Sequence, residues 1–206
     1  EDVYFGAGRN YWLNLLALDT RPASWAWNLE HPPVTKYVVG LGSLWSESMA
    51  GPRTGSALLG GATAAVAYLF GRDAFSDRRV GLVAALLVGL LPSLVAHGRV
   101  AGHEATAVFL YTLTVWLAWR GLRGAAPRWG LVLAAGACFG LTVGARLVNV
   151  TVVLVVLALV AGVAVERRRD RLPAGDRILH AVAWGAVGIV TFVAVWPRLW
   201  SHPLYH

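Results

Sequence analysis

The stretch WGLVLAAGACFGLTVGARLVNVTVVLVVLALVAGVAV, residues 129–165, decides the class of fold. It contains a single charged residue, Arg146, between two apolar runs at 129–145 and 147–165. A helix needs about 20 mostly apolar residues to cross the hydrocarbon core of a membrane, and each run approaches that length. The stretch therefore predicts two membrane-spanning helices joined by a very short turn at Arg146.

Four further runs without Asp, Glu, Lys or Arg predict additional spans at 54–71, 80–98, 105–119 and 178–197. The gaps between runs are short, so we expect consecutive spans to pack as antiparallel hairpins. Small residues are frequent inside the runs, and they allow helices to approach one another closely in lipid. The sequence thus predicts an all-α fold, a polytopic transmembrane helical bundle with six spans.

The composition of the 206-residue chain excludes a water-soluble globule. Hydrophobic residues make up 57% of the chain and charged residues 14%, and the mean hydropathy is +0.57. Soluble domains carry about 45–50% apolar and about 25% charged residues. A single cysteine, Cys138, also excludes a disulfide scaffold. The net charge of +7 lies in short arginine clusters between apolar runs, as topology signals do, so we expect no nucleic-acid partner.

The arginines also predict the orientation of the chain in the membrane. The turns after the first, third and fifth predicted spans hold eleven arginines, whereas the intervening turns hold three. Cytoplasmic loops carry the excess of basic residues. We therefore expect Glu104, Arg146 and the whole N-terminal segment on the extracytoplasmic face of a multi-pass protein of a plasma membrane or bacterial inner membrane.

The first 53 residues differ from the rest, with four tryptophans, five carboxylates and no clean span. Their pattern predicts short helices in the interface plane, one over 10–18 and a second over 36–45. We therefore divide the chain into an extracytoplasmic loop with interfacial helices (1–53), a six-span region (54–197) and the start of an outer loop (198–206). We expect the chain to be truncated at both ends.

Two motifs of the N-terminal segment have candidate functional residues. Residues 1–6 (EDVYFG) place Glu1 and Asp2 before an aromatic pair, either as the start of an exposed loop or as a general base. The motif EHPPVTK contains His31 and the only lysine, Lys36, around a proline pair that suits a helix start. The N–H groups of a helix N-terminus favour an anion. The alternative for Lys36 is a snorkelling side chain at the interface.

Two further motifs lie in the expected outer turns. The turn RVAGHE contains Arg99, His103 and Glu104, and Glu104 has a structural explanation because a helix N-terminus stabilises a carboxylate. Arg146 is alone in its turn, where it is expected to pair with an acid, a phosphate group or lipid headgroups. The sequence has no metal-ligand cluster, phosphate-binding glycine loop or Ser–His–Asp signature, so we expect no metal and no cofactor.

In their order, these motifs resemble the membrane-embedded, lipid-phosphate-dependent glycosyltransferases of the GT-C superfamily. The closest branch is the dolichyl-phosphate-mannose protein mannosyltransferase-like proteins with the bacterial aminoarabinose transferases. Residues 1–6 are similar to the family's acidic pair and Phe-Gly, in reversed acidic order, and 31–36 keep its His-Pro-Pro-x-x-Lys. The further matches are Arg99 followed by Glu104 where the family has Asp, the basic residue of Gly144-Ala145-Arg146, and the aromatic-Pro-x-Leu-Trp segment 196–200.

The resemblance implies an enzyme that moves a sugar from a polyprenyl-phosphate donor to a hydroxyl of a protein, lipid or glycan acceptor, without a cofactor. It also implies that this fragment is inactive alone, because family members have about twice as many spans. By the same resemblance, Lys36 and Arg146 would bind the donor phosphate. The implied catalytic residues are Glu1, Asp2 and Glu104, supported by His31, Arg99 and His103, and membrane lipids are expected partners.

Two other classes of function remain open from the sequence. A transporter or flippase of lipid-linked precursors would also need several spans and outer cations. A non-catalytic assembly subunit would agree with the altered acidic positions, since both Glu1-Asp2 and Glu104 depart from the residue types usual in the family.

Overall fold

The computed structural model describes residues 1–123, 128–169 and 175–200, and every regular element in them is a helix. This confirms the all-α fold class. The longer helices are α1 (Asp2–Leu16), α2 (Val34–Ser43), α3 (Ala50–Phe75), α4 (Arg78–Gly89), α5 (Pro92–Gly98), α6 (His103–Leu122), α7 (Trp129–Ala145), α8 (Val152–Arg169) and α9 (Gly175–Ala194). Three short 3₁₀ helices are η1 (Pro22–Trp25), η2 (Leu147–Thr151) and η3 (Pro197–Leu199).

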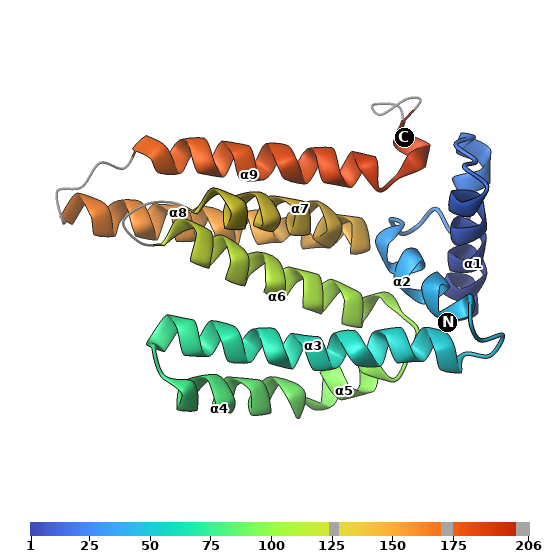
Figure 1. Cartoon of the computed structure of the whole chain (residues 1–206), viewed down its shortest axis with the longest axis horizontal. Helices are drawn as coiled ribbons and strands as arrows, with labels where there is room; N and C mark the ends of the chain where they lie inside the picture. Colours follow the sequence, from blue (N-terminus) through green and yellow to red (C-terminus); the bar gives the residue numbers. More distant parts are fainter. Residues whose placement is uncertain (124–127, 170–174, 201–206) are drawn as a thin grey trace.

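The helices α3 to α9 form an elongated bundle, and α1 and α2 lie at one end of it (Figure 1). We call this end the loop end. At the opposite end α3 is followed by α4, and α6 leads towards α7. We call it the arginine end, because Arg72, Arg78, Arg120 and Arg128 lie there. Two of the predicted hairpins are present, because α3 packs against α4 and α6 against α7, whereas α7 packs mainly against α9 and not against α8, the next α-helix along the chain.

Within the described residues, four helical segments are long and apolar enough to cross a membrane: Ala50–Phe75, His103–Leu122, Leu147–Glu166 and Arg177–Ala194. Large apolar side chains such as Leu154, Ile189 and Val190 are exposed on them, as lipid-facing residues are. These segments support the polytopic bundle predicted from the sequence. Helix α7 coincides with the predicted span at 129–145 but has only 17 residues. The number of six spans stays a prediction.

The second predicted span, 80–98, is broken. It consists of α4 and α5, which are bent by 61° relative to each other. Proline lacks an N–H and disfavours the helical conformation of the preceding residue. Accordingly, Leu91 is extended with φ −62° and ψ 117°, and Pro92 begins α5. The expectation of one continuous helix was therefore wrong, because hydropathy alone does not detect a break at Pro92.

The two expected interfacial helices are present with different bounds. Helix α2 (Val34–Ser43) agrees with the prediction over 36–45, whereas α1 begins at Asp2 and not near residue 10. Glu1 is the N-cap of α1 and Asp2 lies in its first turn. A helix N-terminus favours negative charge, so the acidic pair starts a helix here and does not lie in a loop.

Glycines at the crossing of α1 and α2 let the two backbones touch. A Cβ on Gly8 would lie 2.6 Å from the backbone nitrogen of Gly40, and a Cβ on Gly40 would lie 2.7 Å from the Cα of Gly8. Real Cβ contacts are longer, and a backbone atom cannot rotate away as a side chain can. The crossing therefore requires glycine at both positions.

We predict that Gly40→Ala separates α1 from α2 and lowers the free energy of unfolding by about 1–3 kcal/mol, as overpacking does in other cores. The measurement is the thermal unfolding temperature of the protein in detergent. Gly6→Ala is the matched control, since it also lies in α1 and a Cβ there would meet no atom within 4 Å. Equal unfolding temperatures for the two variants would contradict the prediction.

Candidate active site

At the loop end, Glu1 is held by two other segments of the chain. Its Oε1 accepts hydrogen bonds from Arg53 Nε at 2.9 Å and from the backbone N–H of Ala101 at 2.8 Å. Its Oε2 accepts from the Arg53 guanidinium at 2.6 Å. The contact with Arg53, followed by the Ala101 hydrogen bond, lowers the pKa of Glu1 to about 2. A carboxylate with both oxygens occupied and such a low pKa is a weak general base.

The neighbouring Asp2 is in a different environment. It is exposed, and within the described part of the chain no hydrogen bond or ion pair reaches its carboxylate. The two adjacent acids therefore have separate roles: Glu1 joins the start of α1 to α3 and to the turn before α6, and Asp2 is free to contact another molecule.

Three aromatic rings from distant parts of the sequence meet beside this acidic pair. Tyr4 stacks on His31 with ring centroids 5.9 Å apart, and His31 lies 4.9 Å from His103. The Tyr4 hydroxyl is 2.7 Å from Nδ1 of His103. Burial, and next the charge of Glu104, raise the pKa of Tyr4 to about 12, so Tyr4 keeps its proton. The tautomer of His103 decides which group donates: when Tyr4 donates to Nδ1, a neutral His103 carries its proton on Nε2.

Glu104 follows His103 at the start of α6. Its Oε1 lies 3.0 Å from Nε2 of His103 without hydrogen-bond geometry, and this contact is an ion pair only when His103 is protonated. The Glu104 side chain is 32% exposed, so it remains accessible to a ligand. The chain Tyr4–His103–Glu104 thus connects α1, which carries Asp2, to the first turn of α6.

Glu104 also belongs to two pockets that share one side of α6. The first, the apolar pocket, has a volume of about 260 Å³ and lies beside the break between α4 and α5. The second has a volume of about 180 Å³; most of its surface is apolar too, and we call it the polar pocket because Arg146 and Asn149 lie in it. Besides Glu104, both are lined by Val108 and Thr112; the apolar pocket adds Thr63, Val88, Leu91, Ser93, Leu94 and His97, and the polar pocket adds Ala107, Tyr111, Arg146 and Asn149.

Arg146 lines the polar pocket where α7 ends. Its extended backbone separates α7 from η2, as the predicted short turn requires. The side chain is exposed, and no acid of the described residues pairs with it. Thr35 of α2 donates a hydrogen bond to the carbonyl of Ala145 at 3.3 Å, which ties this turn to the loop end. Arg146 is therefore an exposed cation with no ion-pair partner among the described residues, and it lines the same pocket as Glu104.

Lys36 has a different environment from the one expected for a phosphate ligand or a snorkelling side chain. It is 1% exposed, and its Nζ donates to the carbonyls of Trp27, Asn28 and His31 at 3.0, 2.6 and 2.6 Å. An ammonium has three hydrogens, and these three carbonyls accept all of them. Burial lowers the pKa of Lys36 to about 8, so the ammonium is still the main form at neutral pH. Lys36 thus fixes the loop that carries His31.

Arg99 lies apart from the other predicted site residues. It is the exposed C-cap of α5 and lines a pocket of about 240 Å³ with Gly60 of α3 and Leu94 of α5. The structure therefore brings His31, His103, Glu104 and Arg146 to one region, with Glu1 beside it through Ala101. It does not bring Arg99 or the Lys36 ammonium into the polar or the apolar pocket.

Tyr4 and Arg53 are site residues that reasoning from the sequence did not select. Tyr4 was visible only as part of an aromatic pair, and Arg53 stood unmarked just before the first predicted span. Nothing local indicates that they contact residues about 50 to 100 positions away. In the described residues, no group of three or more His, Cys, Asp or Glu is arranged to hold a metal ion.

Comparison with known proteins gives one match. The family model described as dolichyl-phosphate-mannose-protein mannosyltransferase matches residues 30–197, which is most of the chain. The matched range includes His31, Lys36, Glu104 and Arg146, and it excludes Glu1 and Asp2. No curated protein and no solved structure matches the chain.

Proposed function

Because the chain belongs to the dolichyl-phosphate-mannose-protein mannosyltransferase family, a family of membrane glycosyltransferases, we propose that it moves a sugar from a polyprenyl-phosphate donor to an acceptor hydroxyl at the loop end. The observation that carries this proposal is the position of Glu104 between an apolar and a polar pocket. A polyprenyl-phosphate sugar has the same two parts, an apolar chain and a polar head. The bias of arginines to the other end supports an extracytoplasmic location of this site.

The donor fits the two pockets in one direction. The isoprene units next to the phosphate occupy the apolar pocket, beside the break between α4 and α5. The phosphate then lies in the polar pocket, where the Arg146 guanidinium donates two parallel hydrogen bonds to its oxygens. Negative charge on the phosphate grows as the bond to the sugar breaks, so Arg146 stabilises the departing group.

The transfer step needs a base and no acid. The acceptor oxygen attacks the anomeric carbon while the bond between that carbon and the phosphate oxygen breaks. The bonding electrons leave with polyprenyl phosphate, and the Asp2 carboxylate takes the proton of the acceptor hydroxyl. Asp2 is chosen over Glu1 because Glu1 is occupied by Arg53 and Ala101. Glu104, next to His103, accepts hydrogen bonds from hydroxyls of the donor sugar or the acceptor.

We predict that Arg146→Gln weakens binding of the donor about tenfold or more, the loss typical of a charge-assisted contact. The Kd of labelled polyprenyl-phosphate mannose is measured with the full-length protein in nanodiscs, since binding needs no identified acceptor. Arg9→Gln is the control, because Arg9 is exposed on α1 and lines neither pocket. An unchanged Kd for Arg146→Gln, with the Kd for Arg9→Gln also unchanged, would contradict the proposal that Arg146 binds the donor phosphate.

A second candidate function is a transporter or flippase of lipid-linked precursors. The bend of 61° between α4 and α5 favours it, because transporters build their sites from broken helices. Proteoliposomes with a fluorescent polyprenyl-phosphate sugar separate the two functions. Protein-dependent movement of the lipid between leaflets supports the transporter, and sugar transfer without such movement supports the glycosyltransferase.

A further inference from the structure

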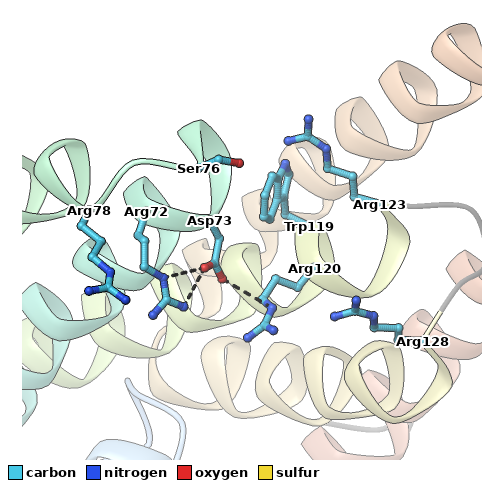
Figure 2. A pocket seen from close by; sticks show the side chains of 8 residues that line it. All are labelled: Arg72, Asp73, Ser76, Arg78, Trp119, Arg120, Arg123 and Arg128. Carbon is cyan, nitrogen blue, oxygen red and sulfur yellow. Dashed lines mark hydrogen bonds and ion pairs between the residues drawn. The ribbon is translucent and has the colours of Figure 1, made fainter.

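The arginine end contains an open cavity that the glycosyltransferase proposal does not use. Its volume is about 600 Å³, and side chains from four segments line it (Figure 2). Five of these side chains are guanidinium groups and one is a carboxylate: Arg72 and Asp73 of α3, Arg78 of α4, Arg120 and Arg123 of α6, and Arg128 just before α7. The charged residues of this cavity therefore come from two parts of the chain that are distant in sequence, 72–78 and 120–128.

The carboxylate neutralises only a small part of this positive charge. Asp73 accepts hydrogen bonds from Arg72 at 2.7 and 2.9 Å, and Arg120 Nε lies 3.5 Å from its other oxygen. Arg78, Arg123 and Arg128 form no ion pair with any described residue. One acid against five arginines leaves the lining with a formal charge of +4.

Aromatic rings hold three of these guanidinium groups in place. Arg123 lies over the ring of Trp119 at 4.9 Å from its centroid, Arg120 over Trp116 at 5.2 Å, and Arg72 over Tyr68 at 5.7 Å. Figure 2 shows Arg123 beside Trp119. A guanidinium stacked by its face keeps its N–H groups at the edge, where they can bind an oxyanion.

Membrane topology alone does not require this arrangement. Topology depends on the number of basic residues near the ends of spans, and it is indifferent to whether their side chains share a cavity. Arg79 and Arg169 show the difference, since both are exposed at the same end without lining the cavity. Guanidinium groups gathered around one cavity repel one another, and an anion bound among them relieves this repulsion.

We propose that this cavity binds a phosphate-bearing anion. Arginine matches phosphate oxygens with paired N–H donors, and the lining offers three arginines that pair with no carboxylate among the described residues. The volume of about 600 Å³ is many times the ~30 Å³ that one water molecule takes in the liquid, so a phosphate with an attached group fits. The same chemistry is presented by the headgroup of an anionic lipid and by a soluble phosphate compound.

The test compares two double variants of the full-length protein in nanodiscs. Arg78→Gln with Arg123→Gln removes two cavity charges and leaves both Asp73 contacts intact. Arg79→Gln with Arg169→Gln removes two charges from the same end outside the cavity. One arm measures retained phosphatidic acid by native mass spectrometry, and the other titrates pyrophosphate into phosphatidylcholine nanodiscs by calorimetry. Unfolding temperatures confirm that all variants are folded.

The expected result is a loss of affinity of about tenfold or more for the cavity variant, against no more than about twofold for the control variant. A selective loss in the phosphatidic acid arm identifies a lipid headgroup as the ligand, and one in the pyrophosphate arm identifies a soluble compound. Equal losses in the two variants, or no binding of either probe to the unmodified protein, would overturn the proposal.

Discussion

Asp2→Asn is expected to lower sugar transfer about 10²–10⁴-fold, the range associated with loss of a general base. The variant keeps the size and hydrogen-bonding capacity of the side chain but cannot accept the acceptor's proton. Because no described residue is bonded to the Asp2 carboxylate, the unfolding temperature and the Kd for the donor should stay unchanged. The proposal thus predicts a loss in kcat without a loss in donor binding.

Glu1→Gln is the matched control for this experiment. It removes the ion pair with Arg53, whose side chain is 49% exposed, and such exposed pairs contribute about 0–1 kcal/mol to stability. Transfer should therefore fall much less than in Asp2→Asn. The assay follows label from polyprenyl-phosphate mannose into acid-stable product, in membranes that contain the full-length protein as their only transferase of this kind. Near-normal transfer by Asp2→Asn, or a larger loss of transfer in Glu1→Gln, would contradict the assignment of Asp2 as the general base.

The sequence was sufficient for the fold class, because hydropathy detects apolar runs whatever their tertiary contacts. Each predicted span coincides with helix in the described residues, and the turn at Arg146 is as short as expected. The break in 80–98 required a local rule that hydropathy omits, namely the effect of Pro92 on Leu91. The start of α1 at Asp2 has a local signal in the acidic pair, whereas the packing of Gly8 against Gly40 joins distant residues and leaves no periodic signal.

The candidate site was predictable in its residue types and not in its contacts. His103, Glu104 and Arg146 were selected because polar residues at the ends of apolar runs are costly and therefore noticeable. Their grouping with Tyr4 and His31 depends on how α1 and α2 fold back over α6, which one sequence does not reveal. The same limitation explains Lys36. The sequence shows that Lys36 is the only lysine, but it does not show that backbone carbonyls surround its ammonium group.

Lys36→Met is expected to lower the free energy of unfolding by about 1–3 kcal/mol, since the half-buried carbonyls of Asn28 and His31 lose their donor, whereas the Trp27 carbonyl still accepts from the Tyr11 hydroxyl. Transfer should be lost as well, because His31 is released from its place between Tyr4 and His103. We therefore propose that Lys36 is a positioning residue for His31 and its loop, and that Arg146 alone binds the donor phosphate.

Lys36→Arg separates this role from phosphate binding by Lys36. If Lys36 contacted the donor, arginine would keep the charge, and the unfolding temperature measured without donor would be normal. The planar guanidinium is larger than an ammonium and does not match three carbonyls that converge on one point, so we expect Lys36→Arg to be destabilised nearly as much as Lys36→Met. His31→Ala completes the series: it should lower kcat while the unfolding temperature changes little, because the Lys36 bond is to the His31 backbone and survives the substitution. A stable Lys36→Arg protein with a weakened donor Kd would instead make Lys36 a phosphate ligand.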